Sequence, residues 1–282
     1  MYERVRAALP VAVADSAPVL TSVTSDIRML ALRTPTLPPA AHTNVYLVGP
    51  ERGPVAVVDP GSPYPDQQAA LDAVLDELPV SLVVLTHHHG DHVGGAAALA
   101  ARWEVPIAAH PLTARKLAGT IEVQQLIEDG GLVHGAKAIH TPGHASGHLC
   151  FELAGATIAG DMVAGIGTIL IDPSDGDMAL YMASLETLLA RPPTMLLPAH
   201  GPPIADGPGK LGEYLAHRRL RERRVFDALT EVPTTVRELL PIVYSDTPRV
   251  LWPLAERSLL AHLQTLKRDG RARDAGADRW FR

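Results

Sequence analysis

Short apolar runs separated by turn residues cover the first 205 residues of the chain. Runs of strand length occur at Ile27–Leu32, Val45–Val48, Val55–Val58, Val80–Leu85, Val105–Ala109, Ala138–His140, Cys150–Leu153, Thr157–Ala159 and Met195–Leu197. Apolar residues at helical spacing occur in the longer segments Asp66–Leu78, Gly94–Ala101 and Ala179–Leu189. A strand followed by a turn and often by a helix is typical of a layered α/β domain, with functional side chains on loops at the strand ends.

The pattern changes after residue 206, where helices become longer and more polar. A helix is predicted at Gly209–Leu229 and another at Leu251–Arg268, which Gly270 ends. Between them, Thr235-x-x-Glu238 is a capping box that opens a helix through Val243. Turn residues at Ala275-Gly276 predict a terminal hairpin. We therefore expect a catalytic α/β domain at 1–205 and a small winged-helix-like α+β domain at 206–282.

Charge divides along the same boundary. Residues 1–205 hold 10 basic and 20 acidic side chains, whereas residues 206–282 hold 15 basic and 11 acidic ones. Much of the basic character lies on the first of the late helices, at His217, Arg218, Arg219, Arg221, Arg223 and Arg224. Such a helix face can bind a phosphate or a carboxylate. The commoner arrangement is exposure to solvent with ion pairs to the acidic domain. Aromatic residues are only 4% and scattered, so no stacking platform for single-stranded nucleic acid is evident.

Other counts exclude whole classes of protein. No apolar run approaches the ~20 residues of a membrane-spanning helix, so we expect no membrane span. Because Cys150 is the one cysteine, the chain has neither an internal disulfide nor a cysteine zinc cluster, and we expect Cys150 in the core. Glu3 and Asp15 flank a short apolar stretch that Pro10 interrupts, which is unlike a signal peptide. We therefore predict a cytoplasmic protein.

Potential metal ligands are concentrated in one short motif. His87-x-His89-x-Asp91-His92 follows a predicted buried strand and is bounded by glycines. A single histidine is more often a packed or surface residue, but four such side chains at this spacing point to metal binding. Imidazole and carboxylate groups bind zinc, and they also bind manganese and iron. Further candidates at predicted strand ends complete a two-metal set, namely His144, Asp161 and His200.

These motifs resemble those of the metallo-β-lactamase-fold hydrolases. The segments concerned are Thr86-His87-His88-His89-Gly90-Asp91-His92, Gly143-His144, Gly160-Asp161 and Ala199-His200-Gly201. Gly165-x-Gly167-Thr168, Tyr181-Met182-x-Ser184-Leu185, His217-Arg218-x-x-x-Arg221-Glu222 and Ile242-Val243-Tyr244-x-x-Thr247-Pro248 resemble the β-lactamase-like 2 branch of that superfamily. The resemblance implies an αββα sandwich followed by a winged-helix-like domain.

The resemblance also implies roles for particular residues. One ion would be held by His87, His89 and His144, the other by Asp91, His92 and His200, with Asp161 bridging the two. Asp59 would orient a ligand histidine from behind, as an alternative to a plain turn cap. Tyr181 and Ser184 would form part of the cleft wall, unless they only pack their helix. His217, Arg218 and Arg221 are candidates for binding substrate.

Activities known in and near this branch are thioester hydrolysis and cleavage of single-stranded RNA, and the fold does not choose between them. We predict a hydrolase with two Zn²⁺ ions, Mn or Fe being alternatives, in which a metal-bridging hydroxide attacks an ester or thioester. Asp91 and Asp161 are the predicted catalytic carboxylates, and Asp91 would also orient the nucleophile or accept its proton. The alternatives are an RNA endonuclease and a non-catalytic binding protein. The sequence has no Gly-x-Ser-x-Gly motif, so it does not point to a serine hydrolase. No oligomeric state is predicted.

Overall fold

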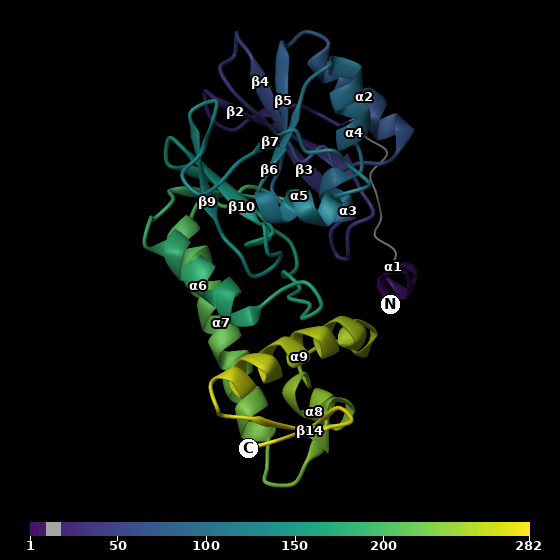
Figure 1. Ribbon diagram of the computed structural model, residues 1–282, viewed down its shortest axis with the longest axis vertical. Coiled ribbons are helices and arrows are strands. Elements are labelled where there is room, and N and C mark those ends of the chain that lie inside the picture. The colour runs from purple at the N-terminus through teal and green to yellow at the C-terminus, as the bar shows by residue number, and fades with distance from the viewer. Residues whose placement is uncertain (10–17) are drawn as a thin grey trace.

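The computed structural model describes residues 1–9 and 18–282 (Figure 1). Pro10 and Asp15, on which the signal-peptide argument depends, lie outside the described residues. Within the described part of the chain, the N-terminal half forms a seven-stranded sheet. Its strands lie in chain order, namely β1 (Thr21–Ser22), β2 (Ile27–Arg33), β3 (His42–Val48), β4 (Val55–Val58), β5 (Val80–Leu85), β6 (Ile107–Ala109) and β7 (Gln125–Leu126).

A second sheet faces the first. Its order is β12 (Met195–Pro198), β11 (Ala156–Gly160), β10 (Leu149–Leu153), β9 (Ala136–His140) and β8 (Leu132–Val133). β10 and β11 form the predicted hairpin, in which Phe151 lies opposite Ile158. β12 runs parallel to β11, so both strands end at the same edge of the sheet.

The alternation of side chains along the strands builds the core between the sheets. In β4, Ala56 and Val58 pack in the same cluster as Phe151 and Ile158 of the facing sheet. Val57 points the other way and packs against helices. Because successive side chains of a strand point to opposite faces, the fully apolar run of β4 is buried on both sides.

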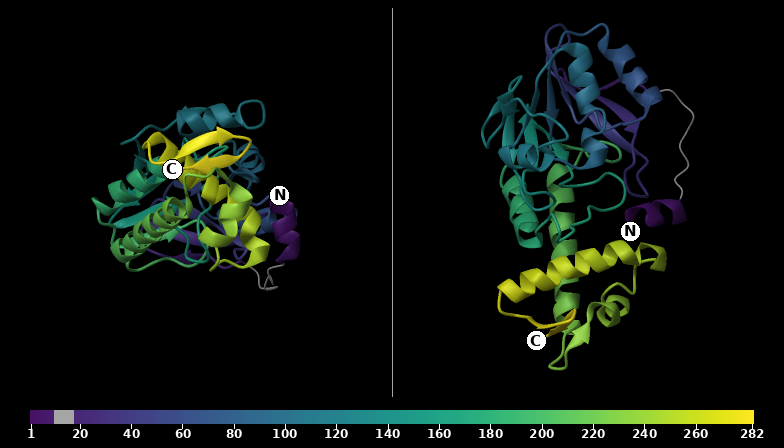
Figure 2. Two further views of the ribbon diagram at one scale, coloured as in Figure 1. Left: turned by 90° about the horizontal axis from the view of Figure 1, so that it is seen from below. Right: turned by 45° about the vertical axis from the view of Figure 1, so that its right-hand side comes forward.

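Helices cover the outer face of each sheet (Figures 1 and 2). α2 (Pro65–Leu75) and α4 (Ala96–Trp103) contribute Leu71 and Leu99 to the cluster behind the first sheet. α6 (Met178–Leu189) and the first half of α7 (Gly207–Ala228) contribute Leu185 and Leu211 behind the second. The order of layers is helix, sheet, sheet, helix, which confirms the expected αββα sandwich.

The C-terminal part has its own apolar core. The second half of α7 packs there with α8 (Val236–Val243) and α9 (Trp252–Arg268), through residues such as Val225, Leu239 and Leu263. The capping box is formed, since the Thr235 hydroxyl accepts from the Glu238 amide and the Glu238 carboxylate accepts from the Thr235 amide at 2.9 Å. A 3₁₀ turn, η1 (Arg249–Leu251), precedes α9. A small sheet has the order β13 (Thr234–Thr235), β15 (Arg279–Phe281), β14 (Arg273–Gly276).

Several predicted boundaries were wrong. α2 ends at Leu75 rather than Leu78, because Pro79 disfavours helical geometry in the residue before it. β6 begins at Ile107 rather than Val105, since Pro106 lacks the N–H that a strand needs. The terminal hairpin turns at 277–278, both residues having positive φ, and not at 275–276. The short helices α1 (Tyr2–Ala8), α3 (Gly90–Val93) and α5 (Pro111–Leu117) were not predicted.

α7 joins the two parts of the molecule and runs from one into the other (Figures 1 and 2). Tyr214 and Leu215 belong to the core of the sandwich, and Val225 belongs to the C-terminal core. Because one helix serves both cores, the division after residue 205 stays a prediction. Among the described residues, no helix has both the length and the apolar character needed to cross a membrane.

Candidate metal centre

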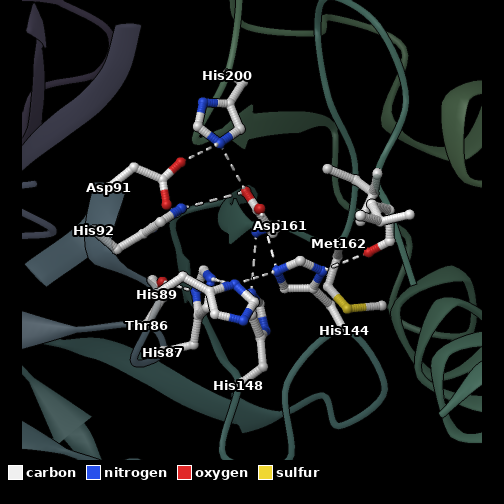
Figure 3. A network of polar contacts seen from close by, with 12 residues as sticks. Thr86, His87, His89, Asp91, His92, His144, His148, Asp161, Met162 and His200 are labelled. Atoms are coloured by element: carbon white, nitrogen blue, oxygen red, sulfur yellow. Dashed lines mark hydrogen bonds and ion pairs between the residues drawn. The ribbon is translucent and has the colours of Figure 1, made fainter. Parts of the chain in front are cut away.

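The residues of the predicted centre come from the ends of several strands and meet in one place (Figure 3). The loop after β5 carries His87 and His89, and α3 follows at once with Asp91 and His92. The remaining side chains follow β9, β11 and β12, respectively, and are His144, Asp161 and His200. Because these strands deliver their ends to one edge of the two packed sheets, segments over a hundred residues apart supply one site.

Three ring nitrogens converge on a single point. His89 Nδ1 lies 3.0 Å from His87 Nε2 and 2.9 Å from His144 Nε2. Ligand nitrogens of a tetrahedral zinc ion, each about 2.0–2.1 Å from the metal, lie about 3.3 Å from one another. The observed separations are close to this spacing, so these three side chains fit one divalent cation.

A second group lies beside the first, with Asp161 between them. Asp161 Oδ2 is 3.3 Å from His144 Nε2, whereas Asp161 Oδ1 is 3.3 Å from His200 Nε2 and 3.5 Å from His92 Nε2. His200 Nε2 is also 3.6 Å from Asp91 Oδ2. The two oxygens of one carboxylate therefore face the two groups of ligands separately.

Two buried polar atoms in this centre have no hydrogen-bond partner among the described residues, His92 Nε2 and Asp161 Oδ1. Leaving buried polar atoms unpaired costs free energy, so such atoms call for a ligand. A divalent cation between imidazole and carboxylate donors satisfies both. The histidine and aspartate clusters therefore fit a divalent-metal site, with donors that suit zinc, iron or manganese.

The outward nitrogen of each ring is held by the fold. The Asp59 carboxylate accepts from His92 Nδ1 at 2.7 Å and from the Thr86 hydroxyl at 2.6 Å. His144 Nδ1 donates to the Leu170 carbonyl at 2.9 Å, and His200 Nδ1 donates to the His42 carbonyl at 3.0 Å. These acceptors fix the tautomer that turns Nε2 toward the metal position.

Sequence reasoning missed Asp175. Its Oδ2 accepts from His89 Nε2 at 3.0 Å and from His88 Nε2 at 3.1 Å, and its Oδ1 pairs with Lys116 at 2.9 Å. The contact with His89 leaves Nδ1 of that ring free to face the other ligands. The one signal in the sequence is the acidic turn at 172–177 after an apolar segment, which resembles any surface turn.

His148 also supports the centre from behind. It is fully buried, and its Nε2 accepts from the backbone amide of Asp161 at 3.0 Å. Its Nδ1 lies 2.8 Å from the Thr141 hydroxyl. Gly160, with a φ of 47°, leaves no room for a side chain here, since an added Cβ would lie 2.5 Å from His148 Nε2. The glycine is therefore required for the approach of the ring to the turn that carries Asp161.

Burial sets the protonation of several ligands. It lowers the pKa of His87 well below the usual value and lowers the pKa of His144 to about 4. Both rings are therefore neutral at pH 7, which is the metal-binding form. Burial raises the pKa of the Asp161 carboxyl, but the surrounding histidines, His200 above all, hold it well below its usual range. This carboxylate is therefore negatively charged at neutral pH.

The centre lies at one end of a cavity of about 820 Å³. The sandwich and the C-terminal part both line it, and α1 adds Tyr2 and Arg6. The candidates from α7, His217, Arg218 and Arg221, are in its wall. Tyr181 and Ser184 are not in the lining, contrary to the predicted cleft-wall role. They hold the loops of the centre from behind, since Tyr181 donates to the Met162 carbonyl and Ser184 to the Pro142 carbonyl, each at 2.7 Å.

The expected solvent exposure of the basic helix was wrong for two of its arginines. Arg218 and Arg221 are only 3% and 7% exposed. Arg218 lies against the Ile169 carbonyl and the Tyr181 ring, and Arg221 lies against the Val243 carbonyl and the Tyr244 ring. The expected ion pair with the acidic domain is present for Arg219, which pairs with Glu186 of α6. Arg221 and Arg224 instead pair with Asp246 of the C-terminal part.

The comparisons with known proteins agree with this architecture. Residues 38–200 match the model of the metallo-beta-lactamase superfamily, and residues 235–280 match the beta-lactamase associated winged helix domain. The chain belongs to the metallo-beta-lactamase superfamily, and it is a hydrolase of that superfamily with a C-terminal winged helix domain.

Relatives are similar over much of their length. The beta-lactamase-like protein 2 homolog of Drosophila melanogaster is 28% identical over 277 residues, which cover 91% of this chain and 92% of the relative. The atrochrysone carboxyl ACP thioesterase of Emericella nidulans is 35% identical over 206 residues, which cover 67% of this chain and 61% of the relative. A beta-lactamase domain protein from Burkholderia ambifaria has the same fold, with a TM-score of 0.80, 24% identity and coverage of 95% and 96% of the two chains.

Proposed function

We propose that the chain hydrolyses a thioester or ester at a centre of two divalent cations, zinc being the expected metal. The observation that carries the proposal is the meeting of histidine and aspartate donors at one end of the cavity. His92 Nε2 and Asp161 Oδ1 are buried there, 3.5 Å from one another, without a hydrogen-bond partner among the described residues. The proposed division of ligands is His87, His89 and His144 for one cation, Asp91, His92 and His200 for the other, and Asp161 for both.

The chain's own residues position the reaction. When bound, divalent cations lower the pKa of coordinated water and stabilise negative charge on a carbonyl oxygen. Asp59 and Asp175 hold the rings of His92 and His89, so the ligands are oriented before substrate arrives. The Asp91 carboxylate lines the cavity, and we assign it the role of accepting the proton of the attacking water.

The cavity supports an acyl group as the substrate. In addition to the residues of the metal centre, the wall of the cavity includes apolar side chains, namely Ile166, Ile169, Leu170 and Leu254. The Emericella nidulans relative is named as a thioesterase acting on an acyl carrier protein, which supports the thioester class. The cavity is large enough for a drug-sized ligand.

The RNA-cleaving alternative was favoured by the branch resemblance and by the basic C-terminal part, but the described contacts compensate part of the positive charge on α7. Arg219 and Arg224 are paired with acidic side chains, and Glu222 pairs with Arg271. A non-catalytic role would leave the oriented ligand set without a purpose. The cytoplasmic location stays a prediction.

A parallel assay tests the proposal. Zinc-loaded protein is incubated with an acyl-N-acetylcysteamine thioester and, separately, with an unstructured RNA oligonucleotide. We expect release of free thiol and no RNA cleavage, and we expect chelator-treated protein to release little thiol. Cleavage of RNA without thioester turnover would favour the alternative. Equal thiol release with and without metal would overturn the metal-dependent proposal.

A further inference from the structure

Arg218 is a buried cation in the wall of the cavity that holds the metal centre. It is 3% exposed, and it comes from the middle of α7, where the sandwich meets the C-terminal part. A guanidinium has five N–H donors and stays charged at every physiological pH. Burying such a charge without adequate hydrogen-bond and ion-pair partners costs free energy.

The described residues give Arg218 little compensation. One terminal nitrogen, Nη2, donates to the Ile169 carbonyl, and the guanidinium lies 5.3 Å from the centre of the Tyr181 ring. Its Nε is buried without a hydrogen-bond partner in the described chain. No described carboxylate lies within ion-pair distance of it, although many other arginines of the chain have such a partner.

Arg221, one turn further along α7, is a buried arginine whose charge is compensated by hydrogen bonds and an ion pair. It is also buried, but its guanidinium donates to the Asp246 carboxylate at 2.9 and 3.3 Å and to the Val243 carbonyl. It lies 4.2 Å from the centre of the Tyr244 ring. The same helix therefore carries one buried arginine with a full set of partners and one without.

Two histidines near Arg218 are affected by its positive charge and by that of Arg221. His262 is fully buried, and neither of its ring nitrogens has a partner in the described chain. Burial, with Arg218 and Arg221 nearby, lowers its pKa to about 3. Burial and the same two arginines also lower the pKa of His217, which lines the cavity. The opposite end of the cavity carries the carboxylates of the metal centre.

We propose that Arg218 binds an anionic group of the substrate, a carboxylate or a phosphate, while the acyl carbonyl lies at the metal centre. The inference rests on the proposed thioesterase function and names the substrate class more narrowly. A carboxylate or phosphate offers paired oxygens that match the fork of the guanidinium. Such a ligand supplies the acceptor that the described chain does not supply to Nε.

Two sources of the anion are distinguishable with matched substrates. Acyl-N-acetylcysteamine thioesters ending in a carboxylate place it on the acyl side, and the corresponding methyl esters remove that charge. Thioesters of 4′-phosphopantetheine with a neutral acyl group place a phosphate on the thiol side. Dicarboxylic half-thioesters of increasing chain length report the spacing from the reacting carbonyl to Arg218 through the length that is hydrolysed best.

The readout is the ratio of kcat/KM for the anionic substrate to kcat/KM for its neutral partner. We expect Arg218→Met to reduce this ratio at least about tenfold, mainly through KM, and Arg218→Lys to restore part of it. Arg219→Met is the matched control, because Arg219 is the neighbouring exposed arginine paired with Glu186. We expect this control to keep the ratio of the wild type.

Thermal unfolding separates a binding role from a structural one. Because Arg218 lacks a carboxylate partner among residues 1–9 and 18–282, we expect Arg218→Met to unfold at the same temperature as the wild type or higher. We also expect inorganic phosphate or succinate, with a chelator present, to stabilise the wild type and Arg219→Met more than Arg218→Met.

Particular results would overturn the assignment. A lower unfolding temperature for Arg218→Met with an unchanged substrate ratio would make Arg218 structural. Wild type that hydrolyses thioesters without preferring anionic ones would overturn the anion subsite and leave the proposed function standing. If no thioester is hydrolysed, the proposed function fails, and the thermal shifts by phosphate and succinate then decide the subsite alone.

Discussion

At one end of the cavity, His92 and His144 donate their outward nitrogens to fixed acceptors at 2.7 and 2.9 Å. At the other end, Arg218 lines the wall, and its buried Nε has no hydrogen-bond partner among the described residues. The first end is prepared for a ligand by orienting rings. At the second end, the buried guanidinium of Arg218 has too few hydrogen-bond and ion-pair partners in the described chain, which leaves it able to bind a ligand. Under the proposed function this difference separates chemistry from specificity. We propose that the metal end acts on the ester or thioester bond and that Arg218 binds the anionic group attached to it.

The largest effect is expected where both ligand groups meet. Asp161→Ala removes the carboxylate that faces both groups and leaves neighbouring rings without their negative partner. We expect thioester hydrolysis to fall about 10²–10³-fold, with a loss of bound metal measured by mass spectrometry. Asp227→Ala, an exposed position on α7, is the control and should behave as wild type. Retention of full metal content by Asp161→Ala would contradict the bridging assignment.

A smaller loss is expected from the support of one ligand. Asp59 is 2% exposed, adopts a φ of 52° and holds His92 and Thr86 together. We expect Asp59→Ala to weaken metal binding about 10–100-fold, because the His92 ring loses the acceptor that fixes its tautomer. Asp59→Asn keeps the shape and should lose less. Titration with a competing chelator measures both, and unchanged affinity in the alanine variant would show that the ring needs no such support.

Asp175 should matter less than Asp59, since it is nearer to solvent. Its side chain is 17% exposed and shares its charge with His88, His89 and Lys116. We expect Asp175→Ala to weaken metal binding by about tenfold. Lys116→Met removes an ion-pair partner without touching the ligand ring, and we expect it to bind metal as the wild type does. If Lys116→Met lost more metal affinity than Asp175→Ala, the ion pair of Asp175 with Lys116, and not its contact with the His89 ring, would support metal binding.

The smallest effect concerns the compensated arginine at the other end. Burial raises the pKa of Asp246, but hydrogen bonds from Arg221 and Arg224 lower it to about 2 from 3.8. Because the pKa is lower in the folded chain, the stabilisation is present above about pH 4 and is lost as the pH falls toward 2. We expect Asp246→Ala to cost no more than about 1 kcal/mol at pH 7, the carboxylate being half exposed. The difference in unfolding temperature from the wild type should vanish near pH 2, and a difference that persists there would show that the ion pair is not its source.

The motifs of the metal centre were predictable because each is local. His87, His89, Asp91 and His92 lie in one segment after a strand that its own apolar run identifies. His144, Asp161 and His200 each follow a recognisable strand and turn. The layered α/β domain was predictable for the same reason, since strand spacing and helix spacing are both properties of short segments. The αββα arrangement of its layers was implied by the family resemblance.

What the sequence could not show depends on packing between distant segments. Asp175 reaches His89 across 86 positions of the chain, and no local pattern marks it. The burial of Arg218 and Arg221 follows from α7 crossing between two cores, whereas its sequence has the charge of a solvent-facing helix. Tyr181 belongs to a motif of the branch, yet its hydroxyl faces the backbone of Met162 rather than the cavity.

The measurement that tests the central claim most directly is a zinc titration of metal-free protein, followed by thioester hydrolysis at each step. We expect little hydrolysis without metal. We expect the rate to rise until two zinc ions are bound per chain and not to increase with further zinc. Full activity in the metal-free protein would contradict this expectation. A rate of hydrolysis that falls as zinc binds to the histidine and aspartate cluster would also contradict it.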